Sequence, residues 1–152
     1  MADSFLATVC MQLPDSLDQE SIDIINYVLS DGAMPRGGFP EHLFFRYNES
    51  VPRYQALYSP FGVSQYRVSL SRIDGFGFFI QTSIIGIKGV DGYHQFILFF
   101  DWVASLGVMD QVIGYVQSIR DPSNVDLLIC KEGKLYADPK KQFFDGCQLV
   151  NP

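Results

Sequence analysis

The sequence predicts an α+β fold, a two-layer sandwich in which a mostly antiparallel sheet packs against helices. Three features predict this class: an N-terminal β-α unit, period-two strands with hairpin signals after residue 64, and a second, aromatic helix. The chain has 152 residues, of which 47% are hydrophobic, enough to build one core. We therefore expect residues 1–152 to form a single domain.

The N-terminal β-α unit begins with Ser4–Leu13, an apolar, β-compatible run that predicts a strand ending at Pro14. Ser16 with Gln19 fits a capping box at the start of a helix. Apolar and small residues then recur at helical spacing, namely Leu17, Ser21, Ile24, Ile25 and Val28. With Gly32 as its stop, the helix is expected to have about fourteen residues.

Residues 31–62 contain four prolines and four glycines, which break regular structure. We expect 33–62 to be a loop-rich insert with short extended pieces at Leu43–Tyr47 and Tyr54–Tyr58. A loop of this length in a compact domain is usually functional or held by its own aromatic side chains.

The segment QYRVSLSRI, residues 65–73, alternates apolar and polar residues as a strand with one solvated face does. Asp74-Gly75 suits a type I′ turn with positive φ at both positions, which predicts a hairpin. The next segment, 76–87, is apolar on both faces and is expected to lie centrally in the sheet, with a loop at 88–92 after it.

Residues 93–107 are compatible with either a helix or a strand. As a helix, their polar residues His94, Asp101 and Ser105 form one narrow stripe; as a strand, Asp101 would share a face with Ile97. The helix is favoured, with Gly107 as its stop.

Further strands are expected at Gln111–Arg120 and Val125–Cys130. The segment LLICKEGKLYAD then predicts a tight hairpin that turns at Glu132-Gly133.

The net charge of −6 comes entirely from the first 35 residues. These contain no Lys or Arg and six acids: Asp3, Asp15, Asp18, Glu20, Asp23 and Asp31. The remainder holds eleven acids and eleven bases. Stabilisation of a helix N-terminus by acids explains Asp18 and in part Glu20, but not Asp23 or Asp31. The remaining acidity points to encounters with a partner.

Sequence motifs for catalysis, cofactors or metals are absent, so we expect a non-enzymatic protein without cofactor or metal. His42 and His94 are the only histidines and do not lie at metal-ligand spacing. The three cysteines, Cys10, Cys130 and Cys147, form no CxxC and are expected to be reduced. The segment DGFGFF lacks the lysine of a phosphate loop. The negative charge argues against nucleic acid as a partner.

The N-terminus carries Asp3 where a signal peptide would be positively charged, and the apolar stretch FILFF at 96–100 is too short to span a bilayer. The sequence therefore predicts a cytoplasmic protein that does not bind a membrane.

Residues 99–136, FFDWVASLGVMDQVIGYVQSIRDPSNVDLLICKEGKLY, combine an aromatic helix, an IGYV strand and a closing hairpin. In this pattern, and as a small acidic α+β chain, the protein resembles the immunity proteins of bacterial polymorphic toxin systems, including contact-dependent inhibition. The resemblance implies a protein that binds and neutralises one cognate toxin.

The acidic helix names contact residues independently of the resemblance, because acidic surface accelerates encounter with a basic partner such as a nucleic-acid-degrading toxin. Tyr27 would supply an aromatic anchor. The expected partner-binding residues are Asp18, Glu20, Asp23, Asn26, Tyr27 and Asp31.

Two alternatives remain at this point. The chain could be a small-molecule-binding or enzymatic domain with an aromatic pocket near His94, Asp101 and Tyr115. It could also be a subunit of a larger assembly, with its aromatic segments buried against sister chains.

Overall fold

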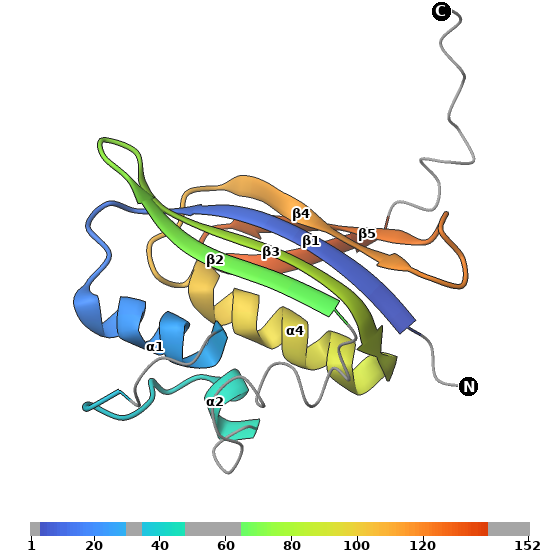
Figure 1. Ribbon diagram of the computed structural model, residues 1–152, viewed down its shortest axis with the longest axis horizontal. Helices are drawn as coiled ribbons and strands as arrows, with labels where there is room; N and C mark the ends of the chain where they lie inside the picture. The colour runs from blue at the N-terminus through green and yellow to red at the C-terminus, as the bar shows by residue number, and fades with distance from the viewer. Residues whose placement is uncertain (1–3, 30–34, 48–64, 140–152) are drawn as a thin grey trace, which may run out of the picture.

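The computed structural model describes residues 4–29, 35–47 and 65–139, which form one sheet with helices on one of its faces (Figure 1). The strands are β1 (Ser4–Leu13), β2 (Gln65–Ile73), β3 (Gly77–Lys88), β4 (Gln111–Ser118), β5 (Val125–Lys131) and β6 (Lys134–Pro139). The helices are α1 (Gln19–Leu29), α2 (Leu43–Tyr47) and α4 (Gly89–Ala104). The predicted α+β class is confirmed. Asp31, Gly32, Cys147 and the piece expected at Tyr54–Tyr58 lie outside the described residues.

The strand order is β2-β3-β1-β4-β5-β6, and every pairing among the described strands is antiparallel. β1 therefore lies inside the sheet, between β3 and β4, although it comes first in the chain. The predicted hairpins β2–β3 and β5–β6 are both present.

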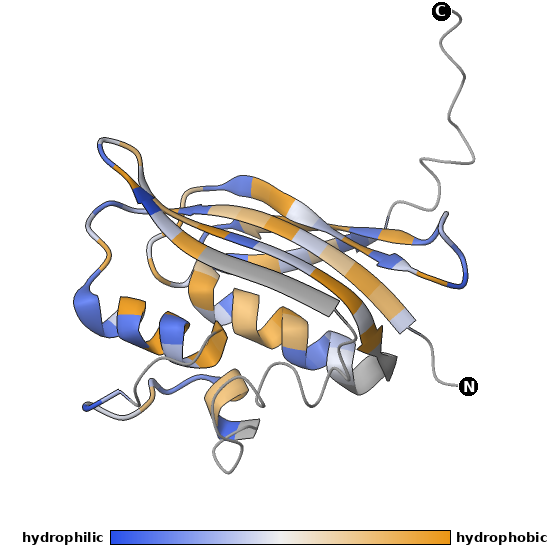
Figure 2. Cartoon of the chain, viewed as in Figure 1, coloured by the Kyte–Doolittle hydropathy of each residue, from blue (hydrophilic) through white to orange (hydrophobic). Residues whose placement is uncertain are grey.

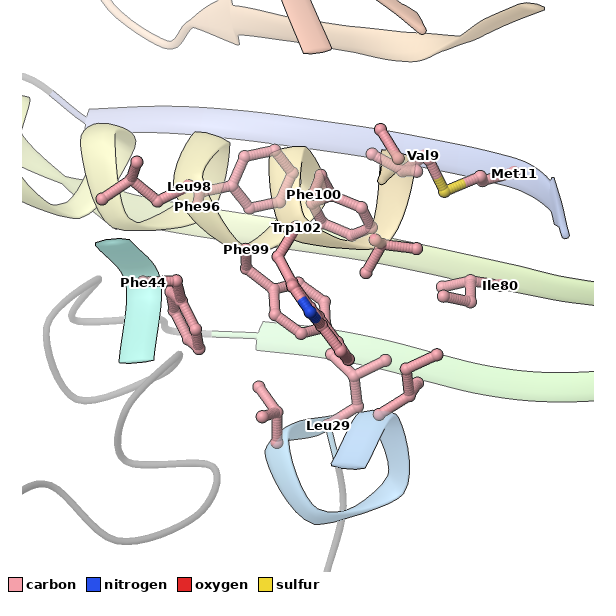
Figure 3. Packing of buried hydrophobic residues seen from close by; sticks show 14 of the residues in the cluster. Val9, Met11, Leu29, Phe44, Ile80, Phe96, Leu98, Phe99, Phe100 and Trp102 are labelled. Carbon is pink, nitrogen blue, oxygen red and sulfur yellow. The ribbon is translucent and has the colours of Figure 1, made fainter. Parts of the chain in front are cut away.

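The core lies between the sheet and the helices. Alternate residues of β1, from Ala7 to Leu13, are buried on the helical side, and the aromatic side chains of α4 fill the space beneath them (Figure 3). The Phe99 ring lies 5.3 Å from the Phe44 ring of α2 and 5.1 Å from the ring of Phe100. α4 therefore packs against the sheet on one side and against α2 on the other, and its aromatic side chains fill the core between them.

The predicted helix at 93–107 is confirmed, but the predicted loop at 88–92 is wrong. α4 begins at Gly89, directly after β3. Gly89 and Gly92 indicated a loop, yet both are part of α4, whose burial beneath the sheet outweighs the low helix preference of glycine. Gly107, with φ of 81°, lies in the turn that follows α4.

The extended piece predicted at Leu43–Tyr47 is also wrong, because these residues form the short helix α2. The carbonyl of His42 accepts hydrogen bonds from the amides of Phe45 and Arg46, and its ring Nδ1 accepts one from the Phe44 amide at 3.1 Å. Phe44 and Phe45 are buried against α4 and its neighbours. Capping by a histidine and burial of two aromatic rings thus override the local preference for extended structure.

The start of α1 differs from the predicted capping box. Asp18, and not Ser16, caps the helix, since its carboxylate accepts a hydrogen bond from the Ser21 amide at 2.7 Å. That bond lowers the pKa of Asp18. The helix has 11 residues, shorter than expected, and its predicted stop at Gly32 lies outside the described residues.

The β2–β3 turn is not the predicted type I′ turn. Gly75 has φ of 85°, but Asp74 has no positive φ, and the Phe76 amide bonds to the Ile73 carbonyl. The β5–β6 hairpin turns at Glu132-Gly133, as the sequence predicts, and both residues have positive φ, 52° and 73°.

A bulge in β4 brings two glutamines together at one end of the sheet. The β1–β4 register ends at Val9 and Gly114, where the bulge shifts the pairing of β4 with β5. Beyond the bulge, the side-chain amide of Gln111 makes the two hydrogen bonds to Gln12 that a neighbouring strand's backbone would otherwise make. Its Oε1 accepts a bond from the Gln12 amide at 3.0 Å, and its Nε2 donates one to the Gln12 carbonyl at 2.9 Å. This amide pair holds the α4–β4 loop against the end of β1.

Candidate functional site

Three of the predicted contact residues are exposed at the start of α1: Asp18, Glu20 and Asp23. Figure 2 shows the start of α1 as hydrophilic. Asn26 is half-buried, and Asp31 lies outside the described residues.

The prediction that Tyr27 anchors a partner is wrong. Its side chain is only 7% exposed, and its ring packs against Phe39 at 5.3 Å. Tyr27 lies three residues after Ile24 and so shares the buried face of α1. The segment that carries Phe39 covers the ring, and nothing in the helical periodicity indicated that segment's position.

The acids at the start of α1 differ from Asp15 in their contacts. Within the described residues, Asp18, Glu20 and Asp23 form no salt bridge. Asp18 caps the helix, and Asp23 accepts a hydrogen bond from the neutral Gln19 side chain at 2.8 Å. Asp15, by contrast, pairs with Arg72 at 3.1 Å, where both side chains are about half exposed. Exposed pairs of this kind contribute little to stability.

Two loops bring further acids to the same end of the molecule. A Cβ on Gly77, after the β2–β3 turn, would lie 3.0 Å from the Asp15 amide, and one on Gly107 would lie 3.8 Å from Pro14. The β1–α1 connection therefore runs between the β2–β3 turn and the α4–β4 loop, at the left in Figure 1. These loops carry the exposed acids Asp74 and Asp110.

We call this surface the acidic end and define it by six exposed carboxylates: Asp15, Asp18, Glu20, Asp23, Asp74 and Asp110. Two bases lie at this surface: Arg72 is bound to Asp15, and Arg36 precedes Gly37, where a Cβ would lie 2.9 Å from Glu20 Oε1. The Asp110 carboxylate accepts a hydrogen bond from the Glu132 amide at 2.8 Å and so contacts the β5–β6 turn. In that turn, Lys131 and Lys134 lie on either side of Glu132 and Gly133. The six carboxylates therefore come from the β1–α1 connection, the start of α1, the β2–β3 turn and the α4–β4 loop.

The alternative site near His94, Asp101 and Tyr115 is not formed. The Asp101 carboxylate contacts His42 at 3.1 Å, whereas His94 is exposed. Tyr115 is exposed on β4 beside the buried Val116, so alternation places its side chain on the sheet face away from the helices. The three side chains do not converge on a pocket.

The His42–Asp101 pair resembles a catalytic dyad, but its hydrogen bonds assign it a structural role. His42 Nδ1 accepts the Phe44 amide, so Nε2 carries the proton that is donated to Asp101 Oδ2. Both ring nitrogens are therefore engaged, and neither is available as a general base.

The other oxygen of Asp101 protects the edge of the sheet. Oδ1 accepts a hydrogen bond from the Leu135 amide at 2.9 Å, an amide on the side of β6 that faces no strand. An edge strand whose amides remain open can pair with another chain. Asp101 thereby joins α4, α2 and β6.

Replacing Asp101 by Ala is expected to lower the free energy of unfolding by about 1–3 kcal/mol, because two hydrogen-bond donors lose their acceptor. Urea denaturation measures the change. A double-mutant cycle with His42→Ala should give a non-additive result, and full additivity would contradict the shared role of the two side chains.

Cys130 is a buried thiol, 1% exposed. Burial, together with the carboxylates of Asp101 and Asp110, raises its pKa from 9.0 to about 11. Burial and a hydrogen bond to Asp126 also raise the pKa of Tyr93. Both groups stay protonated at neutral pH, and a protonated buried thiol is a poor nucleophile.

The raised pKa of Cys130 predicts a loss of stability in alkali. The contribution of the protonated thiol to the free energy of unfolding is complete below pH 9 and is lost as the pH rises towards 11. In that window the thiol ionises in the unfolded chain but stays protonated in the folded protein, so ionisation favours unfolding. Between pH 8 and pH 10.5 the wild type should lose about 1–2 kcal/mol more than Cys130→Ala, as measured by urea denaturation. Parallel losses in the two proteins would show that the thiol does not titrate in this way.

A metal centre is not found in the part of the chain that the structure describes. No group of three His, Cys, Asp or Glu side chains there could hold a metal ion. An open hollow of about 510 Å³ lies beside β5 and β6, lined by Ile129, Tyr136 and their neighbours. No helix among the described residues has the length and hydrophobicity needed to cross a membrane.

Comparisons with protein-family models, curated proteins and solved structures gave no match. Sequence reasoning identified the acids of α1 but missed the contribution of Asp74 and Asp110. Their turn and loop positions indicated exposure, but only the strand order shows that they lie at the same end of the sheet as the β1–α1 connection.

Proposed function

We propose that this chain is a cytoplasmic binding protein that neutralises a cognate, basic toxin by associating with it through the acidic end. The observation that carries the proposal is that six exposed carboxylates from four segments lie at one end of the molecule and outnumber the bases beside them, Arg72 and Arg36. The likeness to immunity proteins of toxin systems agrees with this function. The engaged ring nitrogens of His42 favour binding over catalysis.

Concentrated charge of one sign suits this function for kinetic reasons. A negative surface draws a basic partner into productive encounters and repels acidic competitors and nucleic acid. A toxin that acts on nucleic acid carries a positive substrate site, so an acidic protein surface can occupy that site in place of the phosphates.

The proposal is tested by protection of growing cells. The probe is the C-terminal domain of the protein encoded immediately upstream, expressed in bacteria with and without the present chain. We expect the wild-type chain to restore growth. Glu20→Lys/Asp23→Lys should restore it far less, because it places positive charge on the docking surface.

Glu41→Lys/Asp121→Lys is the matched control, since it changes the net charge equally at exposed positions outside the acidic end. Its protection should equal that of the wild type. A wild-type chain that gives no protection, or equal protection by both charge-reversed proteins, would contradict the proposed function.

A further inference from the structure

We propose that Phe76 and Met109 form a preorganised apolar anchor within the acidic end, and that this anchor inserts into an apolar recess on a basic protein surface. The inference deepens the proposed function and rests on it for the identity of the partner. It assigns a role to two residues outside α1.

The two side chains are the most exposed large hydrophobic groups among the described residues, at 65% for Phe76 and 68% for Met109. Phe76 lies in the β2–β3 turn and Met109 in the α4–β4 loop, and neither side chain belongs to the hydrophobic core. Exposed hydrophobic groups that gather on one surface indicate an interaction site, and interfaces are enriched in Phe and Met.

Hydrogen bonds through two glutamines hold the backbone of both anchors at fixed positions. Gln12 Nε2 donates to the Phe76 carbonyl at 2.7 Å, and Gln111 Nε2 donates to the Met109 carbonyl at 3.2 Å. Gln12 and Gln111 are in turn joined by the paired amide bonds at 3.0 and 2.9 Å. One connected network thus links the two loops through the end of β1.

This arrangement lowers the cost of binding. A loop that must be ordered on association loses part of its interaction energy as conformational entropy, and a loop already fixed does not. Burial of Phe76 and Met109 in a complex can therefore add to the binding free energy with little loss for ordering their loops.

The charges around the anchors specify the partner. Asp74 lies two residues before Phe76, and Asp110 follows Met109 directly. An apolar centre with an acidic rim is complementary to an apolar recess with Lys and Arg around it. A second copy of the chain would present the same acids and be repelled, and nucleic acid would be repelled by its phosphates.

The test uses two synthetic peptides of equal charge, GKKGWLGKKG and GKKGGGGKKG, titrated into the isotopically labelled full chain. We expect the Trp-Leu peptide to bind about tenfold more tightly, because its apolar side chains bury surface of Phe76 and Met109 that the glycine peptide leaves exposed. Amide shifts should concentrate at residues 73–77 and 107–112.

The preference should disappear in Phe76→Ala/Met109→Ala, whose substitutions are on the surface and leave the fold intact. Leu43→Ala, which truncates an exposed leucine elsewhere, should retain it. Equal affinity of the wild type for the two peptides, or shifts centred on another surface, would overturn the inference.

The same variants separate this inference from the proposed function. With the upstream-encoded domain, the anchor variant should dissociate faster, whereas Glu20→Lys/Asp23→Lys should associate more slowly. If that domain is not bound at all, the proposed function fails and the peptide titration alone decides the anchor. If it is bound and the anchor variant dissociates at the wild-type rate, the inference fails alone.

Discussion

Gly114→Ala is expected to prevent the chain from holding its native sheet. A Cβ at this position would lie 1.9 Å from the Thr8 carbonyl oxygen and 2.9 Å from its carbon, both backbone atoms of the neighbouring strand. The φ of 155° is in addition one that L-residues rarely adopt. Relief of the clash would require β1 and β4 to separate, so we expect a loss above about 4 kcal/mol, measured by urea denaturation.

Gly75→Ala is the matched control for this effect. Gly75 also has a positive φ, 85°, but a Cβ there would meet nothing within 4 Å. Its substitution should cost only about 1–2 kcal/mol, the penalty for a left-handed backbone. Equal losses in the two variants would show that φ, and not the contact with β1, determines the requirement at Gly114.

Phe99→Ala is expected to remove about 3–5 kcal/mol from the free energy of unfolding. Phe99 is fully buried, and its ring contacts Phe44, Phe100 and Trp102 with centroid distances of 5.3, 5.1 and 6.0 Å. Its truncation leaves a cavity between α4 and α2 and weakens the attachment of α2 to the core. Thermal and urea unfolding would both report the change.

Phe76→Ala removes a ring of the same size from an exposed turn and should change stability by less than about 0.5 kcal/mol. This contrast checks the placement of the core on the helical side of the sheet. A small effect of Phe99→Ala would contradict that placement.

Much of the fold was predictable because local patterns and tertiary structure agree in most elements. Alternation identified β2, and Glu132-Gly133 identified the β5–β6 turn. The errors fall where distant contacts decide. α2 depends on the burial of Phe44 under α4, and the contact between Asp101 and Leu135 depends on the position of the edge strand. No local pattern encodes either.

The candidate site was predictable only in part. The charge asymmetry of the first 35 residues pointed to α1, and Glu20 and Asp23 are indeed exposed there. Tyr27 was misplaced because an amphipathic pattern cannot show which flank a later segment covers. Asp74 and Asp110 join the acidic end through the strand order β2-β3-β1-β4, which the sequence does not specify.

The most direct test of the acidic end is the rate of association with the upstream-encoded domain, followed by stopped flow from about 20 to 300 mM NaCl. Carboxylates that steer a basic partner make the wild-type rate fall steeply with salt. Glu20→Lys/Asp23→Lys should bind about tenfold more slowly at low salt and approach the wild type at high salt, while Glu41→Lys/Asp121→Lys follows the wild type throughout. Identical rates and salt dependence for all three proteins would contradict docking through this surface.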